Sequence, residues 1–246
     1  RQSIHSFQKY RWDLENQKQT KFWNTWKHRN TYTAAIKSAG APMGFITEED
    51  NFADYPFIVA PAYQLIDQKL VGKWQKYVEN GGNLILSCRT GQKDKNGHFF
   101  EANWSAPIVP LIGADLEFFD MLVTDVNGTI KAGDKTYQWN TWADVLKPKA
   151  GTEVLATYED QFYKGKAAAV TRKLGKGSIT YVGVESINGD FERQIVRTIY
   201  DRANVTIEDL PKGVFVEWRD GFYVGVNYTS EAINLPIPKG SKIVVG

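Results

Sequence analysis

Cysteine and histidine are scarce in this sequence, and their scarcity excludes several kinds of site. Cys88 is the only cysteine in 246 residues, so an internal disulfide and a cysteine metal cluster are both excluded. The three histidines, His5, His28 and His98, do not follow a ligand spacing such as H-x-x-x-H. We therefore expect neither a transition-metal site nor a bound cofactor.

Long apolar runs and an excess of one charge are also missing. No stretch approaches the roughly 18 apolar residues of a membrane span, and the first ten residues, RQSIHSFQKY, do not read as a signal peptide. A formal net charge of +2 and 42% apolar residues indicate a globular protein without a nucleic-acid footprint. We expect no membrane or nucleic-acid partner, and the cytoplasm is the favoured compartment. The missing initiator Met favours a mature form or a fragment of a longer chain.

The stretch 67–91 carries the clearest fold signal. Apolar residues recur at helical spacing through 70–78, polar residues take the opposite face, and a glycine pair ends the helix. Unbroken apolar runs at 57–60 and 84–86 flank this helix, which is typical of a βαβ unit with buried parallel strands. In such sheets a site lies where the strands end.

The rest of the chain predicts further layers around this unit. Period-two runs at 152–158 and 167–173 predict antiparallel strands grafted onto a parallel core. After residue 205 the pattern is purely β, with a hairpin followed by a third strand that starts near Ile233. We divide the chain into an α/β domain, 1–205, and a small C-terminal β-domain, 206–246, whose completeness the sequence leaves open.

Aromatic residues gather near the N-terminus. Trp12, Trp23 and Trp26 lie in a segment that is also rich in Asn and Gln. Because Trp and Tyr dominate interface hot spots, this segment is a candidate subunit-contact surface. Large aromatics are also usually buried, so a place in the core is the alternative.

A cysteine nucleophile is the sharpest enzymatic hypothesis. Cys88 follows a predicted parallel strand, as the nucleophile does in class I glutamine amidotransferases, but glycines are missing on both sides of it. The place where that family carries its base, 183–185, offers Glu185 without a histidine. A buried thiol acting as a small apolar side chain is therefore the favoured interpretation. The acidic loop 47–54 could supply an acid/base pair or bind a cation, but a solvated loop is favoured there as well.

Five passages, in the same order, resemble the middle and C-terminal parts of β-galactosidases of glycoside hydrolase family 42. The most specific contains a glycine pair, a strand and R-T-G-x-K-D, in which Arg89, Lys93 and Asp94 look like the family's pattern. The passages are YRWDLENQKQTKFW (10–23), YPFIVAPAYQLID (55–67), YVENGGNLILSCRTGQKD (77–94), GKGSITYVGV (175–184) and GVFVEWRDGFYVGVNYT (213–229).

The resemblance implies both a fold and a role. In that family an N-terminal (β/α)8 barrel carries two catalytic Glu residues and hydrolyses terminal β-D-galactosides with retention. This chain resembles the part of those enzymes that comes after the barrel. That part is an amidotransferase-like, flavodoxin-like α/β domain that has lost its catalytic set and mediates trimer formation, with a small β-domain after it. The resemblance thus implies no catalytic residue within this chain.

We therefore read the chain as the non-catalytic assembly region of a homotrimeric β-galactosidase, which meets its galactoside through a barrel outside these residues. The alternatives are a stand-alone amidotransferase-like cysteine enzyme using Cys88, and a carbohydrate-binding module that stacks exposed Trp or Tyr on sugar rings. The candidates for the subunit interface or the rim of a sugar pocket are Trp12, Trp23, Trp26, Arg89, Lys93 and Asp94.

Overall fold

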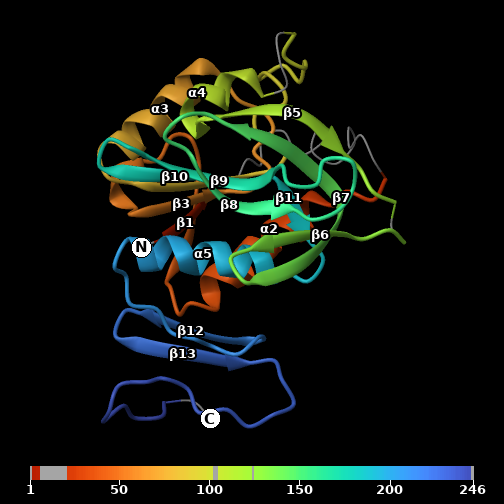
Figure 1. Ribbon diagram of the computed structural model, residues 1–246. Helices are drawn as coiled ribbons and strands as arrows, with labels where there is room; N and C mark the ends of the chain where they lie inside the picture. Colours follow the sequence, from red (N-terminus) through yellow and green to blue (C-terminus); the bar gives the residue numbers. More distant parts are fainter. Residues whose placement is uncertain (1, 6–20, 102–104, 124, 245–246) are drawn as a thin grey trace.

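The computed structural model describes residues 2–5, 21–101, 105–123 and 125–244. Within these ranges it is a mixed α/β structure with four α-helices, an 11-stranded sheet and a separate two-stranded hairpin. Helices α3 (Gln68–Glu79) and α4 (Val109–Ile112) cover one face of the sheet, and α2 (Thr25–Lys37) and α5 (Asp190–Arg202) cover the other (Figure 1).

Five neighbouring strands pair in parallel. Helix α3 links two of them, as the sequence predicted for the βαβ unit, and Asp67 caps this helix by accepting a hydrogen bond from the Leu70 backbone N–H at 2.7 Å. In spatial order the strands are β2 (Met43–Ile46), β1 (Gln2–His5), β3 (Phe57–Ala60), β4 (Asn83–Ser87) and β10 (Gly177–Val182).

The other strands pair antiparallel, and four of them close a small barrel. The ring closes where the long strand β7 meets β9 at Leu146 and Ala167. Strands β5 (Ala114–Asp120) and β11 (Val184–Ser186) pair with β7 outside the ring. The ring is formed by β7 (Lys135–Pro148), β6 (Gly128–Ala132), β8 (Glu153–Tyr158) and β9 (Ala167–Leu174).

The share of antiparallel pairing in the large sheet corrects the sequence prediction. We expected a parallel sheet with an antiparallel insertion, and the mixed α/β class is confirmed. However, most strand pairings in the large sheet are antiparallel. The reason is that 14-residue β7 pairs with β5, β6, β9 and β11, so it extends the sheet well beyond the parallel strands.

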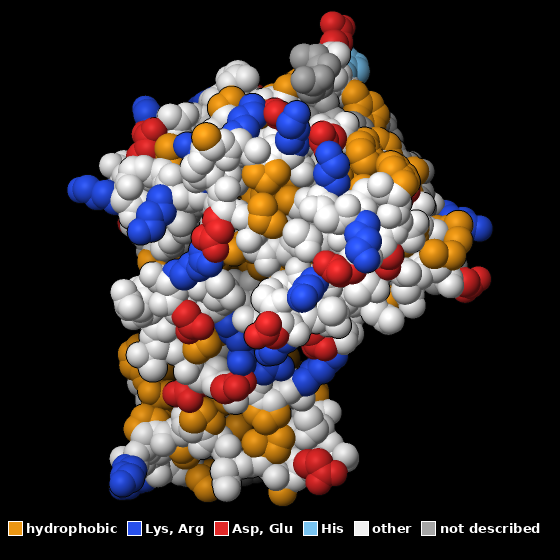
Figure 2. Space-filling view, viewed as in Figure 1, with side chains coloured by type: hydrophobic (Ala, Val, Ile, Leu, Met, Phe, Trp, Pro, Cys, Tyr) orange, Lys and Arg blue, Asp and Glu red, His pale blue; other side chains and the backbone are white. Residues whose placement is uncertain are grey.

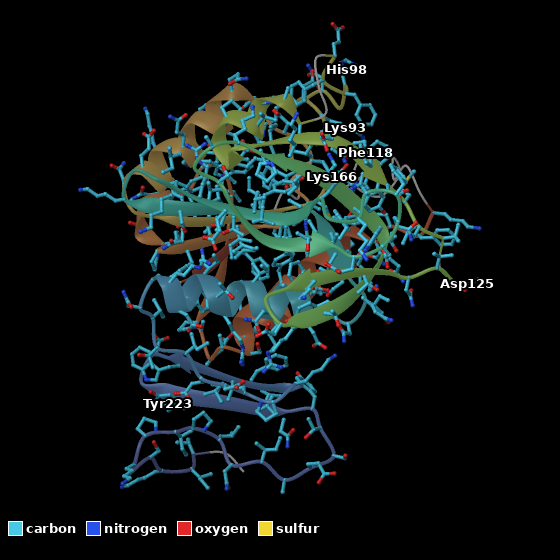
Figure 3. The ribbon with its side chains drawn as sticks, in the orientation of Figure 1. Lys93, His98, Phe118, Asp125, Lys166 and Tyr223 are labelled. Carbon is cyan, nitrogen blue, oxygen red and sulfur yellow. The ribbon has the colours of Figure 1, made fainter. Side chains whose placement is uncertain are left out.

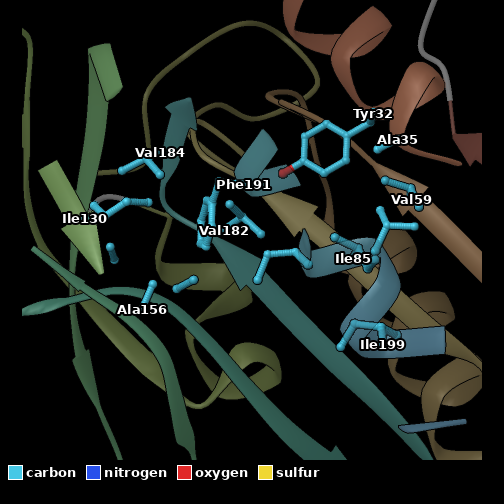
Figure 4. Close-up of a cluster of buried hydrophobic side chains, with 14 of the residues drawn as sticks. Tyr32, Ala35, Val59, Ile85, Ile130, Ala156, Val182, Val184, Phe191 and Ile199 are labelled. Atoms are coloured by element: carbon cyan, nitrogen blue, oxygen red, sulfur yellow. The ribbon is translucent and has the colours of Figure 1, made fainter. Parts of the chain in front are cut away.

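Two hydrophobic clusters lie on opposite faces of the sheet. The cluster beneath α3 and α4 includes Trp74 and Leu111. The other cluster lies beneath α2 and α5 and extends into the barrel (Figure 4). Its labelled members include Tyr32, Ala35, Val59, Ile85, Val182, Phe191 and Ile199.

The C-terminal segment forms a hairpin below α2 and α5 (Figure 1). Strands β12 (Val214–Arg219) and β13 (Phe222–Asn227) pair with each other, and Leu210, Val214 and Val216 form a small buried cluster. The third strand expected near Ile233 is not formed; Ile233 and Leu235 pack against this cluster from an irregular segment. The domain boundary at 205/206 stays a prediction. Two short 3-10 helices, η1 (Phe52–Asp54) and η2 (Ala106–Ile108), complete the described elements.

Candidate functional site

A buried polar cluster lies where β4 ends. Cys88 follows the strand, and the next residue, Arg89, adopts a left-handed backbone with φ of 69°. The Arg89 side chain is buried, and its Cζ lies 4.7 Å from the ring centroid of Trp23 and 4.5 Å from that of Trp142. A guanidinium placed between two indoles gains cation–π attraction while it is shielded from water.

Asp144, on β7, supplies a negative charge to this cluster. Its Oδ2 accepts hydrogen bonds from the Arg89 backbone N–H at 3.1 Å and from the Tyr181 hydroxyl at 2.7 Å. Its Oδ1 accepts a hydrogen bond from Nε1 of Trp142 at 2.9 Å. Burial raises the pKa of Asp144, whereas the hydrogen bonds from Tyr181 and Trp142 oppose that rise. Three donors on one carboxylate make Asp144 the centre that holds β4, β7 and β10 together at this point.

His28 brings an imidazole to the same place, which the sequence analysis did not foresee. Its Nε2 lies 2.7 Å from Ser87 Oγ and 4.0 Å from Cys88 Sγ, and its Nδ1 lies 4.0 Å from Glu185 Oε1. A thiol, an imidazole and a carboxylate thus lie in a row. One sequence signal could have located His28: it shares a helical face with buried Tyr32 and Ala35, at spacings of four and seven residues.

The protonation states in this row do not suit a nucleophile. Burial raises the pKa of the Cys88 thiol well above its ordinary value, and burial lowers the pKa of His28 to about 3. The thiolate, not the thiol, is the reactive form, and the Cys88 side chain is fully buried. The sharp turn also falls at Arg89, one residue beyond the thiol. A structural role, in which the His28–Ser87 contact ties α2 to β4, fits this geometry better than catalysis.

A second carboxyl group, that of Glu192, is buried near Glu185. Glu192 accepts hydrogen bonds from the Ser186 backbone N–H at 2.9 Å and from the Ser186 hydroxyl. Glu185 is 3% exposed, and its Oε1 lies 3.8 Å from Lys27 Nζ, beyond hydrogen-bond distance. Burial raises the pKa of Glu185 to about 7, although the charge of Lys27 opposes the rise. Glu185 therefore exchanges its proton close to neutral pH.

We expect Glu185→Gln to alter how stability depends on pH. The folded pKa of about 7 lies above the ordinary value of 4.5, so folding favours the protonated acid. The stability of the native protein relative to the variant should therefore fall as the pH rises from about 4.5 to 7, by up to about 3 kcal/mol. Urea unfolding of both proteins across this range measures the difference.

Two comparisons complete that experiment. His28, whose pKa is lowered to about 3, makes both proteins gain stability with rising pH, so its contribution largely cancels in the difference. The exposed Glu231 provides a matched control, and Glu231→Gln should give a flat difference. A flat difference for Glu185→Gln as well would contradict the burial of its charge.

The interface candidates from the sequence occupy different depths. Trp23, Arg89 and Lys93 are buried, whereas Trp26 is 40% exposed. Asp94 is partly exposed and accepts hydrogen bonds from two backbone N–H groups in its own turn. Trp12 lies outside the described residues. The contact role of all six stays a prediction, and Trp26 and Asp94 are the described candidates that reach the surface.

A pair of aromatic rings that the sequence analysis missed lies at the surface nearby. Phe162 is 84% exposed and stacks on Phe118, with ring centroids 5.4 Å apart and planes at 16°. Tyr163 touches both rings edge-on and donates a hydrogen bond to Asp120 at 2.6 Å. Phe118 connects to the buried cluster through its neighbour on β5, Phe119, which stacks on the Trp142 ring at 4.7 Å.

This Phe118–Phe162 pair lies on a face rich in hydrophobic side chains. Figure 2 shows orange side chains gathered at the upper right, in the region of β5. Figure 3 shows Phe118 close to Lys166, which forms an ion pair with Glu117 at 2.8 Å. The sequence signals for this pair were two aromatic dipeptides, Phe118–Phe119 and, in an otherwise polar turn, Phe162–Tyr163.

The described residues contain no group of three or more His, Cys, Asp or Glu side chains that could hold a metal ion. Among the helices in these ranges, none is long and apolar enough to span a membrane.

Comparisons with known proteins point to one family. A family model described as the β-galactosidase trimerisation domain matches residues 4–206. The β-galactosidase BgaH of Haloferax lucentense is 30% identical over 244 residues, which are 99% of this chain and 36% of that protein. The β-galactosidase Bga of Halorubrum lacusprofundi is 27% identical, over 92% of this chain and 34% of its own length.

The solved structures agree with that match. A polyextremophilic β-galactosidase from Halorubrum lacusprofundi superposes with a TM-score of 0.87 at 26% identity, covering 94% of this chain and 34% of that structure. A β-galactosidase from the psychrophile Marinomonas ef1 covers the whole chain with a TM-score of 0.83 at 20% identity, and 35% of its own length. The chain thus spans about a third of the length of these relatives.

Proposed function

This chain belongs to the trimerisation-domain family of glycoside hydrolase family 42 β-galactosidases, and on that premise we propose that it is the non-catalytic assembly region of such an enzyme. A trimerisation domain implies self-association into a trimer. The enzyme to which it belongs would hydrolyse terminal β-D-galactosides at carboxylates outside these residues. The observation that carries the proposal is the family match, which covers 4–206.

The arrangement of the strands supports the finer part of the fold proposal. Strands β2, β1, β3, β4 and β10 pair in parallel, and when they are renumbered in chain order their spatial order is 2-1-3-4-5. That order is the flavodoxin-like one, in which ligands bind at the carboxyl ends of the strands. Here this position holds a stacked Arg89 and a neutral thiol, Cys88. We propose that the position serves packing in this chain.

The Phe118–Phe162 pair is our proposal for part of the subunit contact. Phe162 is exposed but not loose, because it stacks on Phe118 and Tyr163 braces both rings. A rigid exposed aromatic can enter a partner at a small cost in conformational entropy. The ion pair between Lys166 and Glu117 provides the polar rim that such contacts usually have.

Replacing Phe162 with Ser should weaken assembly without unfolding the chain. The native protein should show three times the mass of one 27.9 kDa chain in light scattering over a concentration series. Phe162→Ser should shift the midpoint of assembly to at least tenfold higher concentration, because a hot-spot side chain is worth about 2 kcal/mol or more.

Phe45→Ser is the matched control, because Phe45 is 67% exposed on strand β2, at the other end of the large sheet. An unchanged midpoint for folded Phe162→Ser would refute this contact. A native protein that stays monomeric at every concentration would contradict the assembly function itself for these residues.

A further inference from the structure

A groove separates the α/β body from the C-terminal hairpin. It has a volume of about 560 Å³ and is lined by residues of α2, the start of α5 and the start of β12. This volume falls within the roughly 300–1,000 Å³ of typical small-molecule sites. The lining includes Trp26, Asn30, Ala34, Asn188, Asp190 and Phe215.

Aromatic side chains form two sides of this groove, and small side chains line the helix between them. Trp26, 40% exposed, lies on the α2 side, and half-buried Phe215 lies on the hairpin side, where Tyr228 braces its ring edge-on at 6.0 Å. Ala34 and Ala35 line the stretch of α2 that faces the groove and leave room for a ligand. Flat aromatic surfaces with polar groups close by suit a ligand that has both apolar and hydroxylated faces.

Amide groups supply the polar contacts. Asn24 uses its side-chain oxygen to cap α2 at the Lys27 backbone N–H, at 2.9 Å, and it also lines the groove. The exposed Asn30 amide makes no hydrogen bond within the described residues. Amides donate and accept hydrogen bonds without carrying charge, which matches the hydroxyl groups of a neutral ligand.

Three cationic side chains line the groove: Arg193 and Lys212 make hydrogen bonds, and Lys27 lies 3.8 Å from the carboxyl oxygen Oε1 of Glu185. Arg193 donates hydrogen bonds to the Leu210 carbonyl and to Asp209, and Lys212 donates to the Asn188 carbonyl at 3.4 Å. Asp190 places one carboxyl group at the groove, in the first turn of α5, where it offsets the positive end of the helix dipole. The groove therefore does not have the character of an anion site, and a neutral ligand fits it better.

We propose that this groove binds a neutral oligosaccharide, with a sugar ring against Trp26 and its hydroxyl groups bonded to Asn30 and Asn24. The proposal is independent of the assembly role. In this proposal Trp26 contacts a saccharide and not a neighbouring subunit. A segment of a second copy lying in the groove is the competing occupant, and saccharide affinity measured together with molar mass separates the two.

The test uses calorimetric titration of the native chain with β-1,4-linked galactotetraose and, separately, cellotetraose. We expect saturable binding of at least one of them, a loss of at least tenfold in affinity for Trp26→Ala, and a smaller loss for Asn30→Ala. Trp218→Ala is the matched control, because Trp218 is 52% exposed on the hairpin and does not line the groove. Its affinity should stay within twofold of the native value.

Several outcomes would overturn the proposal. The absence of binding to both tetrasaccharides would do so, and so would equal affinities of the native protein and the Asn30 and Trp26 variants. If Trp26→Ala lowered the molar mass in light scattering while saccharide affinity stayed unchanged, the groove would be a subunit contact instead. Asn30→Ala, an exposed helix substitution, keeps the test valid if Trp26→Ala fails to fold.

Discussion

Asp144→Ala is expected to lower the free energy of unfolding by about 3–5 kcal/mol, because each buried donor left without an acceptor costs about 1–3 kcal/mol. The substitution removes the acceptor of three buried donors, the Arg89 backbone N–H, Trp142 Nε1 and the Tyr181 hydroxyl. It also removes the negative charge next to the buried guanidinium of Arg89. Urea unfolding monitored by circular dichroism measures the change.

Two variants sharpen this experiment. Asp144→Asn keeps one acceptor oxygen but not the charge, so its free energy of unfolding should lie between that of the native protein and that of Asp144→Ala. Asp134, exposed in the β6–β7 turn, is the matched control, and Asp134→Ala should change stability by no more than about 0.5 kcal/mol. A loss below about 1 kcal/mol for Asp144→Ala would mean that the cluster holds together without its carboxylate.

Trp23→Ala should be nearly as costly, again about 3–5 kcal/mol, because it empties a large site in the core. The Trp23 side chain is 1% exposed and packs against Ala62, Cys88 and Trp142, and its Nε1 donates a hydrogen bond to Thr25 Oγ1 at 2.8 Å. The urea midpoint of unfolding should fall accordingly.

The neighbouring Trp26 makes the natural comparison. It is 40% exposed with Arg29 across its ring at 5.4 Å, so Trp26→Ala should cost no more than about 1 kcal/mol. Because Trp23 supports the fold, a double Trp23/Trp26 variant would mix unfolding with loss of assembly. The single variants separate the two effects, and a Trp23→Ala protein as stable as the native one would place that ring outside the core.

Local patterns predicted the elements that local physics dictates. Helix α3 follows from the Asp67 cap and the apolar face, and both appear as expected. Strands β8 and β9 follow from their period-two pattern. The pattern near Ile233 had the same period, but no neighbouring strand among the described residues pairs with it, so the segment stays irregular.

The sequence predicted the candidate site less completely than it predicted the fold. Cys88 was recognised as the end of a buried strand, and Glu185 as the carboxylate in the expected place. His28 was not foreseen as a neighbour of Cys88, from which it is 60 residues away in the sequence, yet α2 brings its ring to 4.0 Å from the thiol. The Phe118–Phe162 pair was missed for the same reason, since the stacked contact joins a residue of β5 to one in the distant turn between β8 and β9.

The sequence by itself determined the family and the mixed α/β class, because cap residues, apolar periodicity and the R-T-G-x-K-D run are local signals. Only the tertiary structure decided that Trp23 is core and Trp26 surface, and that Arg89 lies between two indoles. It also decided that the thiol and the imidazole of the buried row are held in unreactive protonation states. The physical reason is that burial and electrostatic environment depend on which distant segments meet, and no local pattern encodes those meetings.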